Sequence, residues 1–477
     1  MHSDPPEVLI LGAGPSGCTA ARLLALWGHT VTVVTRPESQ LGAPLAQSLT
    51  PSCGKFFDLL GIREAIDGAG FARSTGNTVW WGAGEPRVEM FANGATGWQA
   101  TSTALERVML TTAEEAGARV ERVTLTPEQA AARPAAIRLD CTGRAGLLAR
   151  SRAGRRLEAG HRTVSLSAVW ERPGGWGLPD ASHTLIESYA DGWAWSVPLD
   201  AHRRAIAVMV DPRTTSMKRG DGAAVTYRAE LDKTRRLREL LADAAMLPGP
   251  TGWDASMYAS TTYAGDDWLV VGDAASFVDP LSSAGVKKAL ASGWLAAIVV
   301  HTAMANPGMA ATARQFFADR EAEVYANFLS LTRGFLHDGA EGQSHPFWSE
   351  RAEAGERDAL QQAAEREREA VLSAFDRLKA APELVARRGP NVRLEPRPAI
   401  GGSEIVLEPR LVTPADPTGV RFLYDVDVVT LVDLAPTCRQ VPDAYETYLQ
   451  RAGPVALGAF LTALATAVAR GWIVLET

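Results

Sequence analysis

Cysteine is scarce in this sequence and forms no motif. The 477 residues include four cysteines, Cys18, Cys53, Cys141 and Cys438, and no two of them have the C-x-x-C spacing of metal or redox sites. Isolated cysteines argue against a disulfide framework and are by default small buried hydrophobic residues. The eight histidines show no metal-ligand spacing either. We therefore expect no bound metal ion and a reducing, cytoplasmic location.

Blocks of basic residues and long apolar runs are also missing. The net charge is −7, without the basic patch that nucleic acids or anionic membranes attract. Residues 1–7 lack the basic start of a signal peptide, and the apolar run at residues 455–468 is too short to span a bilayer. We expect neither nucleic acid nor a membrane as a partner.

A glycine-rich turn follows the first apolar strand. Residues 8–11 predict a buried strand, residues 19–27 a helix and residues 30–35 a second strand, with Gly12-Ala-Gly-Pro-Ser-Gly17 between the first two. This order is the context in which GxGxxG binds a dinucleotide, because the glycines let the backbone approach the pyrophosphate. A purely structural turn is the alternative. We predict cofactor contacts from Gly12, Gly14, Ser16 and Gly17.

The carboxylate that usually ends the second strand of this unit is missing. Val34-Thr35-Arg36 stands in its place, so nothing there matches the acidic residue that binds the ribose hydroxyls. We expect ribose recognition through Thr35, Arg36 or Glu38.

A second cofactor segment covers residues 268–286. An apolar strand ends at Gly272-Asp273, where a carboxylate can accept hydrogen bonds from polyol hydroxyls, and a Pro-containing loop then opens a predicted helix at 287–300. A helix N-terminus presents unpaired N–H groups that suit the anionic edge of a reduced isoalloxazine. We therefore predict FAD, contacted by Asp273, Pro280, Ala284 and Gly285.

The remaining patterns predict an α/β fold with a Rossmann-like FAD-binding domain, an inserted sheet and a small terminal module. Residues 161–215 alternate apolar and polar side chains, as in an antiparallel substrate sheet, and residues 349–386 predict a solvated, charged helix. After a Pro-rich stretch, two or three helices and a terminal hairpin are similar to a winged helix. The predicted domains are 1–160 and 256–345 (FAD-binding), 161–255 (substrate), 346–390 (helical) and 391–477 (C-terminal α+β module).

Five motifs resemble those of the flavin-dependent halogenases and related monooxygenases, over about residues 6–345. They are Asp140-Cys-Thr-Gly-Arg144, Gly272-Asp273, Trp193-Ala-Trp-Ser-Val-Pro198, Asp279-Pro-Leu-Ser-Ser-Ala-Gly285 and Ala46-Gln-Ser-Leu-Thr-Pro51. The resemblance implies FAD, O₂, a flavin contact from Gln47, and Trp195 with Trp193 between substrate and flavin. A structural aromatic pair is the alternative. Because no second GxGxxG occurs, we expect an external flavin reductant or a separate reductase.

The departures from this family weigh against halogenation. Phe71-Ala-Arg-Ser-Thr-Gly76 places Arg73 where the halogenases carry the lysine that takes up hypohalous acid, and a guanidinium stays protonated. Without halogenation, the resemblance implies hydroxylation of an aromatic ring through a C4a-hydroperoxyflavin. Asp279 is a candidate base or a helix cap, and Arg73 an anion clamp or an ion-paired surface residue. Glu187 and Tyr189 lie on the predicted substrate sheet.

The added C-terminal module suggests a peptide or protein substrate bound through residues 391–477. This chain resembles the branch of the family that hydroxylates a tryptophan side chain within a protein during tryptophylquinone cofactor biogenesis. Two alternatives stay open: a halogenase of a free or carrier-bound aromatic compound, and a flavin-binding maturation partner without turnover.

Overall fold

The computed structural model describes residues 7–40, 45–215, 222–351, 356–381 and 383–476, without the side chains of 356–362. The chain divides into two compact units, Met1–Glu353 and Ala354–Thr477. Each unit is described by itself below.

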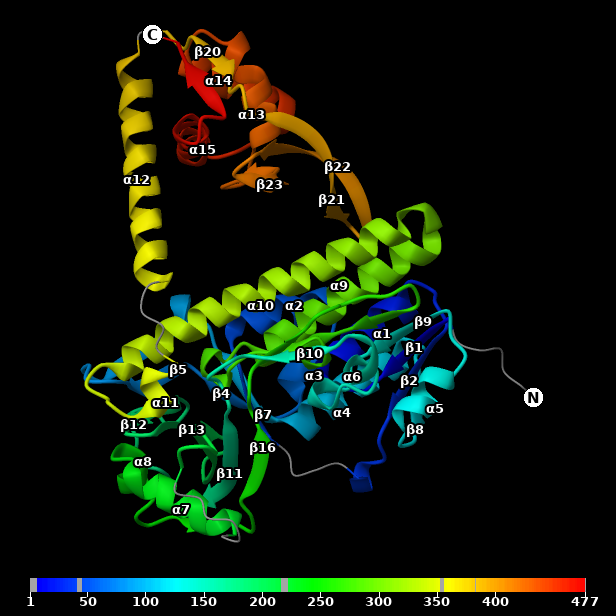
Figure 1. Cartoon of the computed structure of the whole chain (residues 1–477), viewed down its shortest axis with the longest axis vertical. Helices are drawn as coiled ribbons and strands as arrows, with labels where there is room; N and C mark the ends of the chain where they lie inside the picture. Colours follow the sequence, from blue (N-terminus) through cyan, green and yellow to red (C-terminus); the bar gives the residue numbers. More distant parts are fainter. Residues whose placement is uncertain (1–6, 41–44, 216–221, 352–355, 382, 477) are drawn as a thin grey trace. The chain divides into compact units, whose positions relative to one another are not determined.

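The first unit contains a parallel five-stranded sheet, four strands of which are labelled at the right of Figure 1. Its order is β18-β9-β1-β2-β8, with bounds Trp268–Val270, Ile137–Asp140, Val8–Leu11, Val31–Thr35 and Arg119–Arg122. The central strand β1 is buried along its whole length, as expected for a parallel strand covered on both faces. Strand β18 returns beside β9 after the inserted sheet, which confirms the predicted α/β architecture.

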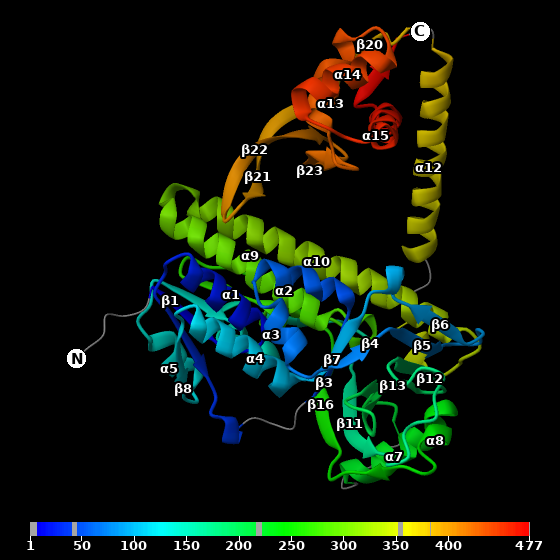
Figure 2. The same ribbon diagram turned by 180° about the vertical axis from the view of Figure 1, so that it is seen from behind.

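Long helices cover this sheet. Helix α1 (Pro15–Leu26) packs against α4 (Ser102–Glu115) and α9 (Gly285–Ala305), and α10 (Ala310–Ala340) packs along α9 (Figure 2). A Cβ atom on Gly293 of α9 would lie 2.3 Å from the carbonyl oxygen of Ser16, so glycine permits the close crossing of α9 and α1. Helix α9 is long and apolar enough to cross a membrane, but most of it is buried against its neighbours, as in the core helix of a globular domain.

The inserted antiparallel sheet is larger than predicted. Strands β11, β14, β13 and β12 follow one another in space, and β15 and β16 pair with β11. Strands β5 and β6, which the sequence analysis assigned to the first part of the FAD-binding domain, extend this sheet because β5 pairs in parallel with β12. The bounds are Val164–Glu171 (β11), Thr184–Tyr189 (β12), Gly192–Pro198 (β13), Arg203–Val210 (β14), Ala245–Met246 (β15), Thr251–Asp254 (β16), Gly76–Trp80 (β5) and Arg87–Met90 (β6).

The two faces of this sheet have different neighbours. Helices α7 (Ala223–Lys233) and α8 (Arg236–Leu240) cover one face, where Tyr227 and Leu237 pack on the strands. On the other face, Trp193 packs with Phe347 and Trp348 of α11 (Pro346–Ser349). Partly buried Trp195, Phe277 and Leu281 join this second cluster, so the sheet meets the segment that follows β18.

Two small sheets connect these layers. One consists of β3 (Ala46–Leu49), β7 (Gly97–Thr101) and β4 (Ala72–Ser74), and the other of β10 (Arg155–Leu157), β17 (Tyr258–Ser260) and β19 (Ser276–Phe277). Short helices α2 (Gly54–Leu59), α3 (Arg63–Gly68), α5 (Pro127–Ala132) and α6 (Ala149–Arg152) complete the unit.

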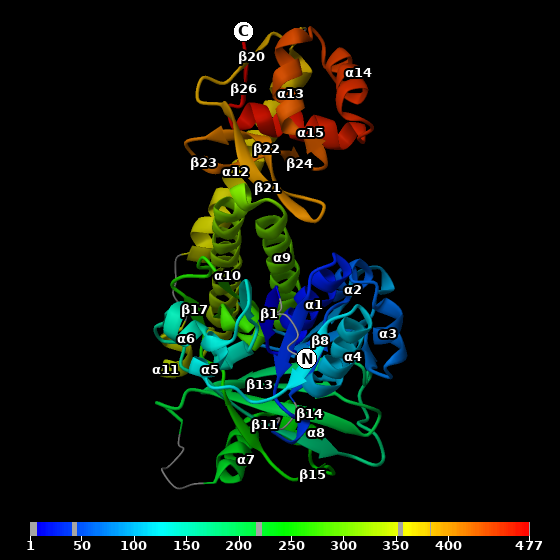
Figure 3. The ribbon, with the colours of Figure 1, turned by 90° about the vertical axis from the view of Figure 1, so that its right-hand side faces the viewer.

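The second unit has its own hydrophobic core around three helices, α13 (Val428–Leu434), α14 (Val441–Ala452) and α15 (Leu457–Ala469) (Figure 3). Ala374 and Leu378 of α12 (Glu356–Ala380) lie in the same core. The predicted boundary at residue 391 is therefore too late, because α12 needs the α13–α15 helices to bury its apolar face.

The strand pairing of this unit differs from a terminal hairpin. The last strand, β26 (Ile473–Leu475), pairs antiparallel with β20 (Ala386–Arg388), far away in sequence. The hairpin of the unit, β21 (Arg393–Gly401) with β22 (Glu404–Thr413), precedes the helices, and β23 (Asp416–Val420) extends it. Two-residue strands β24 (Phe422–Leu423) and β25 (Val426–Asp427) follow.

Candidate functional site

The turn between β1 and α1 leaves no room for a side chain at Gly12 or Gly17. Gly12 has φ +100°, and a Cβ atom there would lie 2.4 Å from the carbonyl oxygen of Cys141. A Cβ atom on Gly17 would lie 2.0 Å from the carbonyl oxygen of Gly12. Gly14, the N-cap residue of α1, offers no side-chain acceptor to the first turn. The backbone N–H groups of this helix start can therefore bind an anionic group such as the FAD pyrophosphate.

A cavity of about 290 Å³ lies beside this turn, at the end of β2. Thr35, Arg36 and Glu38, the three predicted ribose-binding candidates, all line it. Glu106 of α4 lines it as well, and its carboxylate oxygen Oε1 would be 3.9 Å from a Cβ atom on Gly14. Burial raises the pKa of Glu106 to about 7, against the attraction of Arg36. The position and size of the cavity fit the adenosine half of FAD.

Sequence reasoning missed Glu106. It stands in an amphipathic helix beside Leu105, with no local motif to mark it, and approaches the glycine turn only because α4 packs against α1.

The two cofactor segments meet in space. A Cβ atom on Gly272, which has φ +65°, would lie 2.8 Å from the hydroxyl of Ser16. The carboxylate of Asp273 follows at the carboxyl end of β18 and is one-third exposed. Burial raises its pKa, while Lys288 and Arg144 lower it.

The side chains of Asp140 and Arg144 make structural contacts beside the site. The buried carboxylate of Asp140 accepts hydrogen bonds from the N–H groups of Thr142, Leu148 and Ala149. Arg144 pairs with Asp254 at 2.8 Å and lies over the rings of Tyr258 and Phe277. This segment therefore ties the parallel sheet to β17 and β19.

Asp279 is 5% exposed and caps the short helical turn Pro280–Ser282. Its carboxylate accepts a hydrogen bond of 3.0 Å from the N–H of Leu281. Burial raises its pKa to about 6, against the Leu281 hydrogen bond and the charge of Arg351. Helix α9 then starts at Gly285 after Ala284, which offers no side-chain cap. Pro280, Ala284 and Gly285 thus lie together on one loop.

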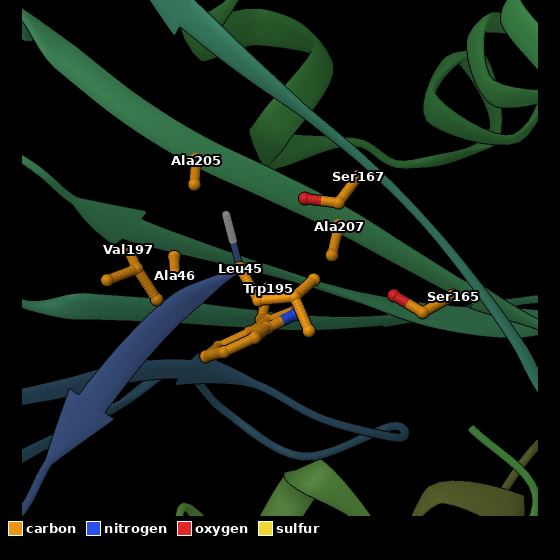
Figure 4. A pocket seen from close by; sticks show the side chains of 8 residues that line it. All are labelled: Leu45, Ala46, Ser165, Ser167, Trp195, Val197, Ala205 and Ala207. Carbon is orange, nitrogen blue, oxygen red and sulfur yellow. The ribbon is translucent and has the colours of Figure 1, made fainter. Parts of the chain in front are cut away.

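Trp195 lines a small pocket of about 20 Å³, the size of one water molecule (Figure 4). The other lining residues are Leu45, Ala46, Ser165, Ser167, Val197, Ala205 and Ala207. The indole N–H of Trp195 is buried and has no hydrogen-bond partner among the described residues. Trp193 is fully buried and packs edge-on against Trp81, at 6.2 Å between ring centres. The tryptophan pair therefore combines one core residue and one pocket residue.

Gln47 is not among the residues that line this pocket. It lies on β3 opposite Ala100, and successive side chains of a strand leave opposite faces. Because Ala46 faces the pocket, Gln47 points to the other side of β3.

Arg73 lies in a surface ion pair. Its guanidinium donates to the carboxylate of Asp67 at 2.6 Å and to the hydroxyl of Thr96 at 2.7 Å. It also stacks on the ring of Trp98, at 4.6 Å from the centroid, and its side chain is 44% exposed. The structure does not bring Arg73 to the Trp195 pocket.

Glu187 and Tyr189 lie on the opposite face of the sheet from Trp195. The carboxylate of Glu187 accepts hydrogen bonds from three backbone N–H groups at the start of α8, and the hydroxyl of Tyr189 donates to Glu230. Both side chains hold α7 and α8 on the sheet.

Two family patterns match the sequence. The FAD binding domain pattern matches residues 6–146, and the tryptophan halogenase pattern matches residues 99–383. A tryptophan 2-halogenase of Chondromyces crocatus is 27% identical over 373 residues, which cover 72% of this chain and 70% of that protein. A flavin-dependent halogenase of Armillaria mellea is 24% identical, over 69% of this chain and 73% of its own length.

Solved structures share the fold over nearly the whole chain. The flavin-dependent halogenase CmlS has a TM-score of 0.77 at 17% identity, covering 99% of this chain and 96% of its own. QhpG, a peptidyl tryptophan dihydroxylase essential for tryptophylquinone cofactor biogenesis, has a TM-score of 0.66 at 22% identity, covering 98% and 99%.

Proposed function

This chain belongs to the flavin-dependent tryptophan halogenase family, and from that premise we propose that it is an FAD-dependent monooxygenase that hydroxylates an aromatic ring. The proposed substrate is a tryptophan side chain within a peptide or protein. Membership makes the chain an FAD enzyme of the halogenase and monooxygenase type. The choice of oxygen over halogen is the proposal.

The observation that carries this choice is the place of Arg73. Halogen transfer in this family is expected to need an amine at this position, but here a guanidinium is bound by Asp67 and Thr96 at the surface. Of the six lysines in the sequence, Lys218 lies outside the described residues, and the other five are absent from the lining of the Trp195 pocket. In the described part of the chain, no amine therefore replaces the missing lysine at this pocket.

The substrate class is supported by the similarity to QhpG, which extends over both units of this chain. The unit Ala354–Thr477 has a separate core, as expected for a distinct domain added to the FAD-binding unit. We assign to it the binding of the peptide or protein that carries the tryptophan.

We assign separate roles in FAD binding, proton transfer and exclusion of water to different residues of this chain. The turn Gly12–Gly17 would hold the pyrophosphate of FAD, Glu106 and Thr35 would bind the ribose in place of the missing carboxylate, and Asp273 would hold the flavin end. Bound FAD, when reduced by an external reductase, supplies the chemistry that activates O₂. We assign to Asp279 the role of accepting the proton that the ring loses at the hydroxylated carbon, because its raised pKa keeps it a usable base near neutral pH. The apolar cluster around Trp193 and Leu281 excludes water.

Halogenation is the second candidate function. The curated relatives named above are halogenases, and Trp193-Ala-Trp195 retains the tryptophan pair of that group. An amine supplied by the substrate or by a partner would be required in place of the lysine.

The test is mass spectrometry of the product. Holoenzyme, a flavin reductase with its reductant, O₂ and excess bromide are incubated with a tryptophan-containing peptide, and in parallel with free tryptophan. We expect the peptide to gain mass in steps of one oxygen atom, without bromine, while free tryptophan does not change. Bromine incorporation would refute the proposal.

Arg73→Ala provides a matched variant for this assay. Because Arg73 lies in an exposed ion pair, we expect oxygen incorporation to stay within about twofold of the unmodified enzyme. Loss of oxygen incorporation in a folded, FAD-loaded Arg73→Ala protein would instead place Arg73 in the reaction.

A further inference from the structure

A buried lysine lies directly behind the turn that carries Asp273. Lys288 belongs to the first turn of α9 and is 3% exposed, whereas its neighbour Lys287 is exposed. A positive charge at a helix N-terminus is unfavourable because the helix dipole is positive there, and burial of an ammonium group adds a desolvation cost. A site that retains such a charge must compensate it with close acceptors.

The hydrogen-bond acceptors of Lys288 lie in the segment that follows β18. The Lys288 ammonium donates to the carbonyl oxygens of Gly272 at 3.0 Å and Ser276 at 2.6 Å. The ammonium also forms an ion pair with Asp273, whose carboxylate oxygen lies 3.7 Å from its nitrogen. Lys288 therefore joins both ends of the turn 272–276 and neutralises the carboxylate between them.

A second contact from α9 holds the same turn. Ser292 stands one helical turn after Lys288, and its hydroxyl accepts a hydrogen bond of 2.8 Å from the N–H of Gly272. Burial raises the pKa of Glu321 of α10, which is 3% exposed, whereas the charge of Lys288 and a hydrogen bond with Ser292 lower it. Its other carboxylate oxygen has no partner within the described part of the chain. Lys288 and Ser292 of α9 and Glu321 of α10 thus place buried polar groups near the turn 272–276.

We propose that Lys288 is a positioning residue for FAD, which fixes the turn 272–276 and favours the reduced, more negatively charged form of the flavin. The inference rests on the assignment of Asp273 to the flavin end of the site, made under the proposed function, and not on the choice of substrate. FAD reduction takes up two electrons, from the external reductase, and one proton to give the anionic reduced form. Removing the buried positive charge reduces the compensation of Asp273 to that from Arg144 and disfavours the extra negative charge of the reduced flavin.

The experiment compares Lys288→Met with Lys287→Met in the full-length protein. The two variants remove the same charge from adjacent positions, one buried under the turn and one exposed. FAD affinity is measured by fluorescence titration of the apoprotein, and the two-electron reduction potential by equilibration with a reference dye. We expect Lys288→Met to raise the Kd for FAD about tenfold or more and to make the potential more negative. Lys287→Met should stay within about twofold in Kd, with an unchanged potential.

Ser292→Ala keeps the inference testable if Lys288→Met does not fold. This variant loosens the same turn but retains the ammonium, so the Kd for FAD should rise about threefold or more while the potential stays constant. An unchanged Kd in Ser292→Ala or in folded Lys288→Met would overturn the inference, as would equal effects of Lys287→Met and Lys288→Met. Because no substrate is present, failure here is distinguishable from failure of the proposed hydroxylation, which the product assay alone decides.

Discussion

Glu106 provides a pH-dependent test of how this chain binds the ribose of FAD. Its carboxylate lines the 290 Å³ cavity at the end of β2, where the sequence has Thr35 in place of an acidic residue. If the ionised carboxylate accepts hydrogen bonds from the ribose hydroxyls, FAD binds only the deprotonated form tightly. The pKa of Glu106 in the free protein is raised to about 7 by burial. FAD affinity should therefore fall as the pH decreases through about 7.

The expected change in the Kd for FAD with pH follows from the pKa of Glu106. With a free-protein pKa of about 7 and a much lower one in the complex, the apparent Kd rises about tenfold between pH 8 and pH 6. Glu106→Gln removes the charge, so the Kd at pH 8 should rise roughly 10- to 100-fold, from the roughly 1.5–3 kcal/mol of a hydrogen bond to a charged group. The residual pH dependence should then disappear.

Fluorescence titration of the apoprotein with FAD at several pH values measures both effects. Glu114→Gln is the matched control, because Glu114 lies on the same helix and lines the same cavity but pairs with Arg122 at 3.6 Å. Glu38→Gln tests the carboxylate that the sequence alone suggested. The reasoning fails if Glu106→Gln binds FAD like the unmodified protein, or if the pH dependence persists in Glu106→Gln and vanishes in Glu38→Gln.

Two further predictions concern the sheet and the loop after β19. Product formation should be lost as the pH falls through about 6, because a base must be deprotonated and the pKa of Asp279 is about 6; in Asp279→Asn this limb of the pH–rate profile should be missing, and an unchanged profile would remove Asp279 from the reaction. Glu187→Ala should leave three N–H groups at the start of α8 without their acceptor. This change should lower the free energy of unfolding by about 3 kcal/mol in urea denaturation but leave FAD affinity unchanged, and a change in affinity would contradict a purely structural role.

The FAD-binding elements could be predicted from the sequence because their requirements are local. Gly12 and Gly17 are needed for the contacts of a single strand–turn–helix segment, and the apolar strand before Asp273 marks its own position. Cys18, Cys53, Cys141 and Cys438 are all buried, as their isolated positions predicted. The alternating pattern over residues 161–215 was also enough to predict an antiparallel sheet there, and β11, β12 and β14 lie on its alternating runs.

The surroundings of the charged side chains and the boundary of the second unit depend on residues that are distant in the sequence. Arg73 is drawn to Asp67 and Trp98, Glu106 reaches Gly14 only through helix packing, and α12 shares a core with helices about fifty residues or more later. Lys288 stands next to the second cofactor segment in the sequence, but only burial distinguishes it from Lys287. The sequence by itself determined the glycine turn of the FAD-binding domain, since backbone geometry is encoded locally. Only the tertiary structure decided which charged side chains lie beside the two predicted cofactor segments, because the energy of a buried charge depends on partners that folding brings together.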